Sequence, residues 1–188
     1  MFSKQALRRL ILPLIIEQFL AVMVGMADIM MVSSVSEAAV SGVSLVDSIS
    51  ILIINIFAAL ATGGAVVAAQ YLGRQEEEQA CFSAKQLILC TTAISAVIMV
   101  MFLIFGRQLI ALIFGKVDPE VLASAQTYLF ITSMSYPFIA LYNSCAALYR
   151  AMGNSRISMV TSLIMNSLNI VGNAILIYGL GMGVEGAA

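Results

Sequence analysis

The chain has 188 residues, of which 61% are hydrophobic and 10% are charged, and its formal net charge is −1. A soluble domain is about 45–50% apolar and about 25% charged, so this composition excludes a soluble globular fold and indicates a membrane protein. The near-zero charge argues against a nucleic-acid partner, which requires a basic surface. The chain has no histidine, which excludes imidazole metal sites and His-based catalytic triads.

Five stretches are apolar over the roughly 20 residues that are needed to cross the hydrocarbon core. The first carries two carboxylates and is too long for the apolar region of a secretion signal, so we interpret it as a membrane helix. The closing residues, GMGVEGAA, look like a loop into a sixth helix. We predict an all-α integral membrane bundle with about five spanning helices and the start of a sixth, the spans lying at residues 10–32, 48–71, 86–105, 128–151 and 159–180.

Basic residues near helix ends predict orientation, because cytoplasmic loops carry the excess of Lys and Arg. One side of the predicted bundle has Arg107 and Lys116, and the other has seven basic residues: Lys4, Arg8, Arg9, Arg74, Lys85, Arg150 and Arg156. We therefore expect a multi-pass protein of the cell membrane whose N-terminus is cytoplasmic. The apolar segment 105–116 is expected to form an extension or an interfacial turn at the outer surface.

The first predicted helix carries two carboxylates, Glu17 and Asp28, and ionisable groups inside a spanning helix are costly. They are 11 positions apart, so they lie within about 20° of one another around the helix and about 16 Å apart along it. Pro13 lies on the same side. The free-energy cost of a charged Asp28 in the membrane falls if the carboxylate binds a proton or a cation, which would make it a coupling site. It also falls if the carboxylate pairs with a hydrogen-bond donor in a structural role. Glu17 is shallower, and three interpretations stay open: it reaches the surface, it pairs with Arg8 or Arg9, or it takes part with Pro13 and Asp28 in cation coupling and transport.

The fifth predicted helix carries a polar stripe, because spacings of four, three and four place its members on one face. Asparagines of this kind often form hydrogen bonds between membrane helices, yet their amide oxygens also suit a cation or a polar substrate. The sequence leaves both interpretations open. The stripe consists of Ser162, Asn166, Asn169 and Asn173.

Other polar residues within the predicted spans are candidates for lining a cavity, although single polar residues in helices mostly pack. No nucleophile–base pair or metal-ligand cluster is visible in the sequence, so we expect no enzyme, no metal site and no organic cofactor. The possible cavity residues are Gln18, Asn55, Tyr136 and Asn143, together with Asn166.

Several motifs occur in order along almost the whole chain. In LILPLIIEQFLAVMVGMADIMMV, Asp28 follows Pro13 by fifteen residues, and SEAAVSGVSL and ATGGAVVAAQYLGR come next. The connection LYRAMGNSRISM has an Arg-x-x-Gly-x-x-Arg pattern, and YGLGMGVEGAA closes the chain. Together these motifs resemble the N-terminal lobe of the MATE family, the multidrug and toxic compound extrusion transporters.

The resemblance implies a twelve-helix fold of two six-helix lobes around a central cavity. It implies export of cationic or amphiphilic compounds, with an organic cation as substrate, in exchange for protons or sodium. The first-helix aspartate of the family, here Asp28, works with a fifth-helix asparagine, matching Asn169, and with an aspartate four residues later. This chain has Asn173 at that second position, so Asp28 is left as the titrating group of the set.

Two other functions stay open from the residues alone. One is a lipid or polysaccharide flippase of a related superfamily, although such proteins need a basic cavity and no Lys or Arg interrupts a predicted span centre. The other is a membrane scaffold subunit that transports nothing. Because half of a MATE-like protein would expose its cavity face, we expect the chain to be completed by a C-terminal lobe or by a second copy.

Overall fold

The computed structural model describes residues 4–187, and the side chains of residues 4–7, 9 and 10 lie outside its described part. The basic residues Lys4 and Arg9 of the orientation count therefore lie outside the described side chains. The described chain is built of helices, which confirms the predicted all-α fold. In order, the elements are α1 (Lys4–Ser33), α2 (Glu37–Gly73), α3 (Glu77–Phe114), α4 (Pro119–Ala151), α5 (Ser155–Ala174), the π-helix η1 (Ile175–Gly179) and the 3-10 helix η2 (Gly183–Gly186).

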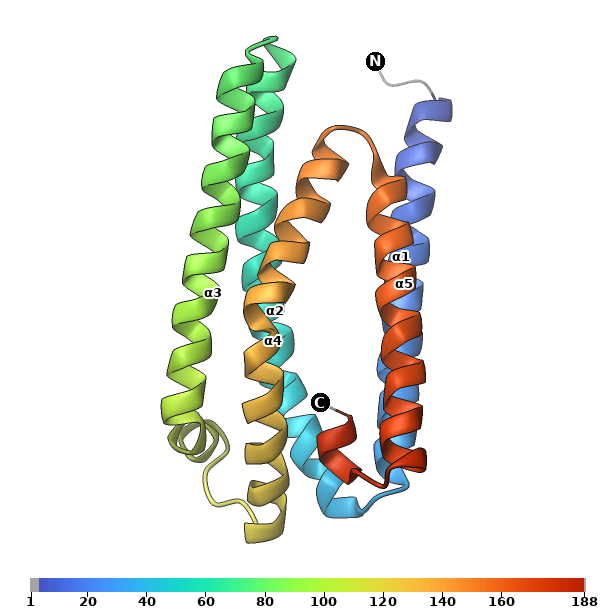
Figure 1. Ribbon diagram of the computed structural model, residues 1–188, viewed down its shortest axis with the longest axis vertical. Coiled ribbons are helices and arrows are strands. Elements are labelled where there is room, and N and C mark those ends of the chain that lie inside the picture. The colour runs from blue at the N-terminus through green and yellow to red at the C-terminus, as the bar shows by residue number, and fades with distance from the viewer. Residues whose placement is uncertain (1–3, 188) are drawn as a thin grey trace.

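The helices form two groups that stand next to each other (Figure 1). α2, α3 and α4 pack on one another, whereas α1 lies along α5 and runs in the same direction. Contacts between the two groups are sparser than contacts within them. The α2–α3 and α4–α5 connections lie at the end of the bundle where α1 begins, and we name this the α4–α5 end. The α1–α2 and α3–α4 connections lie at the opposite end, the α1–α2 end.

Helices α1 to α4 are longer than the predicted spans, whereas α5 begins before and ends before the predicted span 159–180. α2 has 37 residues, and at 1.5 Å per residue it exceeds a hydrocarbon core of about 30 Å, so its ends project beyond the core. The predicted loop residues from Glu37 onward form the first turns of α2, because the Ser36 side chain accepts a hydrogen bond from the Ala39 N–H at 3.0 Å and so caps the helix. Segment 105–116 is mostly helix, since α3 continues to Phe114.

Four helical segments are long and apolar enough to cross a membrane: Ile11–Ser33, Glu37–Gly73, Glu77–Phe114 and Ser155–Gly179. α4 has 33 residues but is more polar, and its polar side chains are directed into the bundle. Ser133, Tyr136 and Ser144 are each 0% exposed. Because α4 runs beside α2 and α3 over a comparable length, we treat it as the fifth spanning helix (Figure 1).

The main core lies between α2, α3 and α4 and is centred on Tyr136. Its ring makes edge-on contacts with Phe57 and Phe102, with centroids 6.2 and 5.8 Å apart, and its hydroxyl lies 3.2 Å from Ser50 Oγ. A hydroxyl pair, Thr91 and Ser144, joins α3 to α4 at 2.7 Å. This helix group is therefore held by both apolar packing and buried hydrogen bonds.

A second apolar cluster closes the α1–α2 end, where both helix groups meet. It contains residues of α1, α2, η1 and the end of the chain, and the partly buried ring of Tyr128 from α4 packs against it. The turn at Gly181 folds η2 back onto the bundle, so that Ala187 is buried in this cluster. Its buried members are Met31, Val32, Ala39, Val43, Ile177 and Ala187.

α2 and α4 approach closely at Gly42. A Cβ at this position would lie 2.9 Å from Ala125 N and 2.9 Å from Ser124 Cβ. These atoms belong to the α4 backbone or are fixed to it, so α4 would have to shift. Gly63, in the same helix, has nothing within 4 Å of the corresponding position.

We predict that Gly42→Ala lowers the free energy of unfolding by about 1–3 kcal/mol, because overpacking a well-packed contact costs about this much. Gly63→Ala is the matched control and should keep or slightly raise stability, since alanine favours a helix by up to about 1 kcal/mol over glycine. Thermal unfolding of the purified protein in detergent measures both. Equal effects of the two substitutions would contradict the close approach of α2 and α4.

Candidate functional site

Both carboxylates of α1 lie against side chains of α5. Asp28 meets Asn173, and Glu17 meets Ser158 near the beginning of α5. The parallel course of α1 and α5 brings these pairs together (Figure 1). Each carboxylate of the predicted first-helix stripe therefore contacts one side chain of α5, and of these two partners Asn173 belongs to the predicted fifth-helix stripe.

Asp28 is half-buried and receives a hydrogen bond from a neutral amide. The Nδ2 of Asn173 donates to Oδ1 of Asp28 at 2.9 Å and also reaches Oδ1 of Asn169 at 3.4 Å. Asn173 is buried, whereas Asn169 is exposed. An amide has no net charge, so this contact satisfies part of the carboxylate's hydrogen-bonding capacity and leaves its negative charge uncompensated.

A second carboxylate, Asp47 on α2, belongs to the same region. The hydroxyl of Tyr128 donates to Oδ1 of Asp47 at 3.2 Å, and the Tyr128 ring packs against the apolar cluster that contains Met31 and Val32 of α1. The sequence analysis missed Asp47 because the predicted span began one residue after it, at 48. The informative signal was the lone aspartate in SLVDSISILI, which lies about three turns inside a helix that begins at Glu37.

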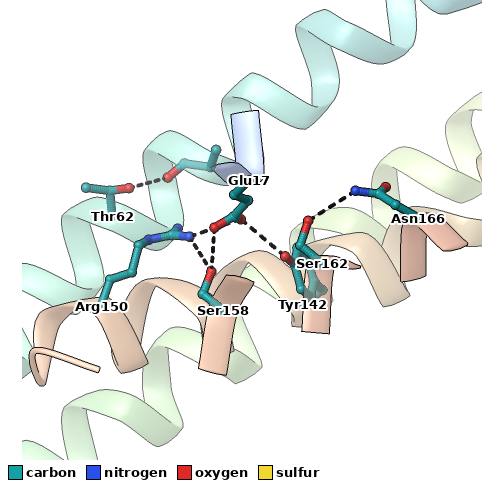
Figure 2. Close-up of polar contacts among 8 residues, drawn as sticks. Glu17, Thr62, Tyr142, Arg150, Ser158, Ser162 and Asn166 are labelled. Atoms are coloured by element: carbon teal, nitrogen blue, oxygen red, sulfur yellow. Dashed lines mark hydrogen bonds and ion pairs between the residues drawn. The ribbon is translucent and has the colours of Figure 1, made fainter. Parts of the chain in front are cut away.

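Glu17 lies at the meeting point of three helices (Figure 2). Its Oε2 accepts a hydrogen bond from Ser158 Oγ of α5 at 2.9 Å, and its Oε1 accepts one from the Tyr142 hydroxyl of α4 at 3.3 Å. Arg150 Nη1, from the last turn of α4, lies 3.6 Å from Glu17 Oε1 and donates to Ser158 Oγ at 3.0 Å. We name these four residues, Glu17, Tyr142, Arg150 and Ser158, the Glu17 network.

Glu17 pairs with a residue that the sequence did not single out. The sequence left open whether Glu17 reaches the surface, pairs with Arg8 or Arg9, or takes part in coupling; Arg8 is exposed, and the side chain of Arg9 lies outside the described residues. Arg150, which the sequence places about 130 positions away, forms the ion pair instead. Nothing in the local sequence pairs these two residues, because only the packing of α1 against the α4–α5 hairpin brings them together.

The two carboxylates of α1 therefore have different electrostatic surroundings. Glu17 is matched by a guanidinium and two hydroxyls. In the part of the chain whose side chains are described, no Lys or Arg forms an ion pair with Asp28. A buried or half-buried charge without a counter-ion has a free-energy cost that a bound cation or proton would remove.

The remaining predicted residues are dispersed. Tyr136 lies in the α2–α3–α4 core, away from the α1–α5 contact. Asn166 Nδ2 donates to Ser162 Oγ at 3.3 Å, within α5 (Figure 2). Pro13 is buried one turn before Glu17, Asn143 is half-buried, and two candidates are exposed: Gln18 and Asn55. Among the described residues, no group of three or more Cys, Asp or Glu side chains is arranged to hold a metal ion.

Comparison with known proteins agrees with this arrangement. The sequence model of the MatE family matches residues 13–175, which is most of the chain. The chain belongs to the MatE family. It is thereby shown to be part of a multi-pass membrane transporter family, as the sequence motifs predicted.

Three relatives show how much of a MatE protein is present. The chain is 31% identical to the "Uncharacterized transporter YisQ" of Bacillus subtilis, covering 94% of this chain and 38% of that protein. It is 26% identical to the "Multidrug export protein MepA" of Staphylococcus aureus, covering 98% of this chain and 41% of that protein. The fold matches a solved MOP superfamily transporter from Pyrococcus furiosus with a TM-score of 0.91 at 25% identity, covering 98% and 40%. The chain thus spans about two-fifths of the length of these relatives.

We predict that Asn173→Leu lowers the free energy of unfolding by about 1–3 kcal/mol, because it removes a donor from a half-buried carboxylate. Asn55→Leu is the matched control on an exposed side chain of α2, and it should change stability by less than about 0.5 kcal/mol. Chemical or thermal unfolding in detergent measures both. Equal losses would mean that the contact between Asn173 and Asp28 contributes nothing.

Proposed function

We propose that this chain forms the N-terminal lobe of a secondary antiporter that exports cationic or amphiphilic compounds in exchange for protons or sodium. A C-terminal lobe or a second copy completes the cavity. Membership of the MatE family and the export activity in the name of MepA support the class of function. The chain spans about two-fifths of the length of its relatives, which supports the proposal that a further lobe or a second copy completes the transporter.

The observation that carries the proposal is that Asp28, at the α1–α5 contact, has an amide donor and, among the described side chains, no Lys or Arg in an ion pair with it. An aspartate at the centre of a spanning helix costs about 2.5–3.5 kcal/mol on insertion scales, and this is an upper bound for Asp28, which lies near the end of α1. One amide donor offsets part of this cost. The remainder favours binding of a proton to the carboxylate or of Na⁺ to its oxygens, for which the amide oxygens of Asn169 and Asn173 are suitable additional ligands.

Neutralisation of Asp28 changes how tightly α1 and α5 are held together. A hydrogen bond to a charged acceptor is about twice as strong as one between neutral groups. The contact from Asn173 therefore weakens when a cation or proton occupies the site, and α1 gains freedom to move relative to α5. One charge crossing a potential of 100 mV supplies about 2.3 kcal/mol, which is enough to drive such a change.

We also propose that the α4–α5 end faces the cytoplasm. Arg74, Lys85, Arg150 and Arg156 lie in or near the connections at that end, while Arg107 and Lys116 lie towards the opposite end. Positive residues concentrate on the cytoplasmic side of membrane proteins. This orientation places the Glu17 network in the half of the bilayer nearer the cytoplasm and Asp28 in the outer half.

We predict that Asp28→Asn in the complete transporter reduces ion-driven efflux of a fluorescent organic cation by more than about tenfold, because an amide cannot alternate between charged and neutral states. Efflux from vesicles with an imposed proton or sodium gradient measures the effect. Glu185→Gln, an exposed carboxylate on η2, is the matched control and should leave efflux unchanged. Undiminished efflux in Asp28→Asn would remove this residue from coupling.

The orientation is tested with single cysteines in a background where the three natural cysteines are serine. A cysteine replacing Asp118, at the α3–α4 connection, should react with a membrane-impermeant maleimide in intact cells. A cysteine replacing Glu76, at the α2–α3 connection, should react only after the membrane is permeabilised. The reverse pattern would invert the proposed topology.

A further inference from the structure

The Glu17 network is where polar side chains join the two helix groups. In the part of the chain that the structure describes, the side-chain hydrogen bonds and the ion pair that cross from the α1–α5 group to the α2–α3–α4 group all belong to it. They run from Tyr142 and Arg150 on α4 to Glu17 and Ser158. Other polar side-chain contacts described here stay within one group, such as that between Tyr128 and Asp47.

The two ends of the bundle are closed by different kinds of contact. At the α1–α2 end, both groups meet in the apolar cluster around Met31, Val32 and Val43. Toward the α4–α5 end, they meet through an ion pair whose side chains are 26% (Arg150) and 15% (Glu17) exposed. Water can rehydrate partly exposed charges when they separate, whereas opening the apolar cluster would expose hydrophobic surface. The end with the Glu17 network is therefore the easier one to open.

Behind this network, a polar stripe leads along α5 toward Asp28. Ser162, Asn166, Asn169 and Asn173 follow at spacings of four, three and four, so they share one face of the helix. Figure 2 shows Ser162 and Asn166 hydrogen-bonded next to Tyr142. Water or a cation that passed the Glu17 network would therefore meet polar side chains along the way to Asp28.

We infer that the Glu17 network is a latch that closes the cytoplasmic access to the α1–α5 polar stripe, and that Glu17 and Arg150 are its positioning residues. The inference rests on the proposed transport function and goes beyond it. Glu17 does not bind the coupling ion, because its charge is already matched by Arg150. Separation of the pair lets α1 move away from the α4–α5 hairpin and opens the stripe to the cytoplasm.

The test measures access behind the latch in the complete transporter. Ser162, which is 8% exposed, is replaced by the single cysteine of the protein, and inside-out vesicles are treated with an impermeant maleimide. Glu17→Gln and Arg150→Gln, which remove one charge each, should raise the labelling rate about 3- to 10-fold. The swapped pair Glu17→Arg with Arg150→Glu, and the conservative Arg150→Lys, should return the rate to within about twofold of the parent.

Two controls separate a latch from a general loss of structure. Glu78→Gln changes an exposed carboxylate at the same end of the bundle and should leave labelling unchanged. Labelling from the outer face, in right-side-out vesicles, should stay at the parent rate in every variant, since a misfolded protein would react from both sides. Unchanged cytoplasmic labelling in the single variants, or a swapped pair that labels as fast as they do, overturns the latch.

The readout also separates this inference from the proposed function. Thiol labelling does not require transport, so the latch can be established even if Asp28→Asn leaves ion-driven efflux intact. Conversely, unchanged labelling in a protein that shows ion-driven efflux removes the latch and leaves the proposed function standing.

Discussion

A carboxylate inside a membrane helix must be paired, hydrogen-bonded or neutralised, and this constraint organises the α1–α5 contact. α1 carries two such groups, and α5 supplies a donor to each of them. The partners differ in charge, however: Glu17 has a guanidinium nearby, whereas Asp28 has an amide. Two carboxylates on one face of the same helix therefore have different partners, a cationic side chain and two hydroxyls for Glu17 and a neutral amide for Asp28.

α4 connects this contact to the rest of the bundle. Its middle buries Ser133, Tyr136 and Ser144 against α2 and α3, and its last turns direct Tyr142 and Arg150 to Glu17. A helix that presents polar groups on several sides is less apolar than its neighbours, because its polar atoms are satisfied by protein and not exposed to lipid. The polarity of α4 is thus a consequence of its position between the two helix groups.

The region around Asp28 departs from the pattern that the family resemblance implies. An asparagine, Asn173, stands where the resemblance implies a second carboxylate, and it donates to Asp28 instead of sharing a proton with it. A different carboxylate, Asp47 on α2, accepts a hydrogen bond from Tyr128, whose ring packs against the apolar cluster at the α1–α2 end. The carboxylates of this region therefore lie on α1 and α2 and not on α1 and α5.

The sequence alone determined the all-α membrane class, the number of long helices and the polar faces of the first and fifth helices, because span length and a 3.6-residue period are local properties. It did not locate the helix ends, since capping at Ser36 and helical turns outside the hydrocarbon extend the elements beyond their apolar runs. Tertiary structure alone decided that Arg150 pairs with Glu17, that Tyr136 packs in the core and that Tyr128 donates to Asp47. Each of these depends on which helices become neighbours, and a contact between residues far apart in the chain leaves no periodic signal in a single sequence.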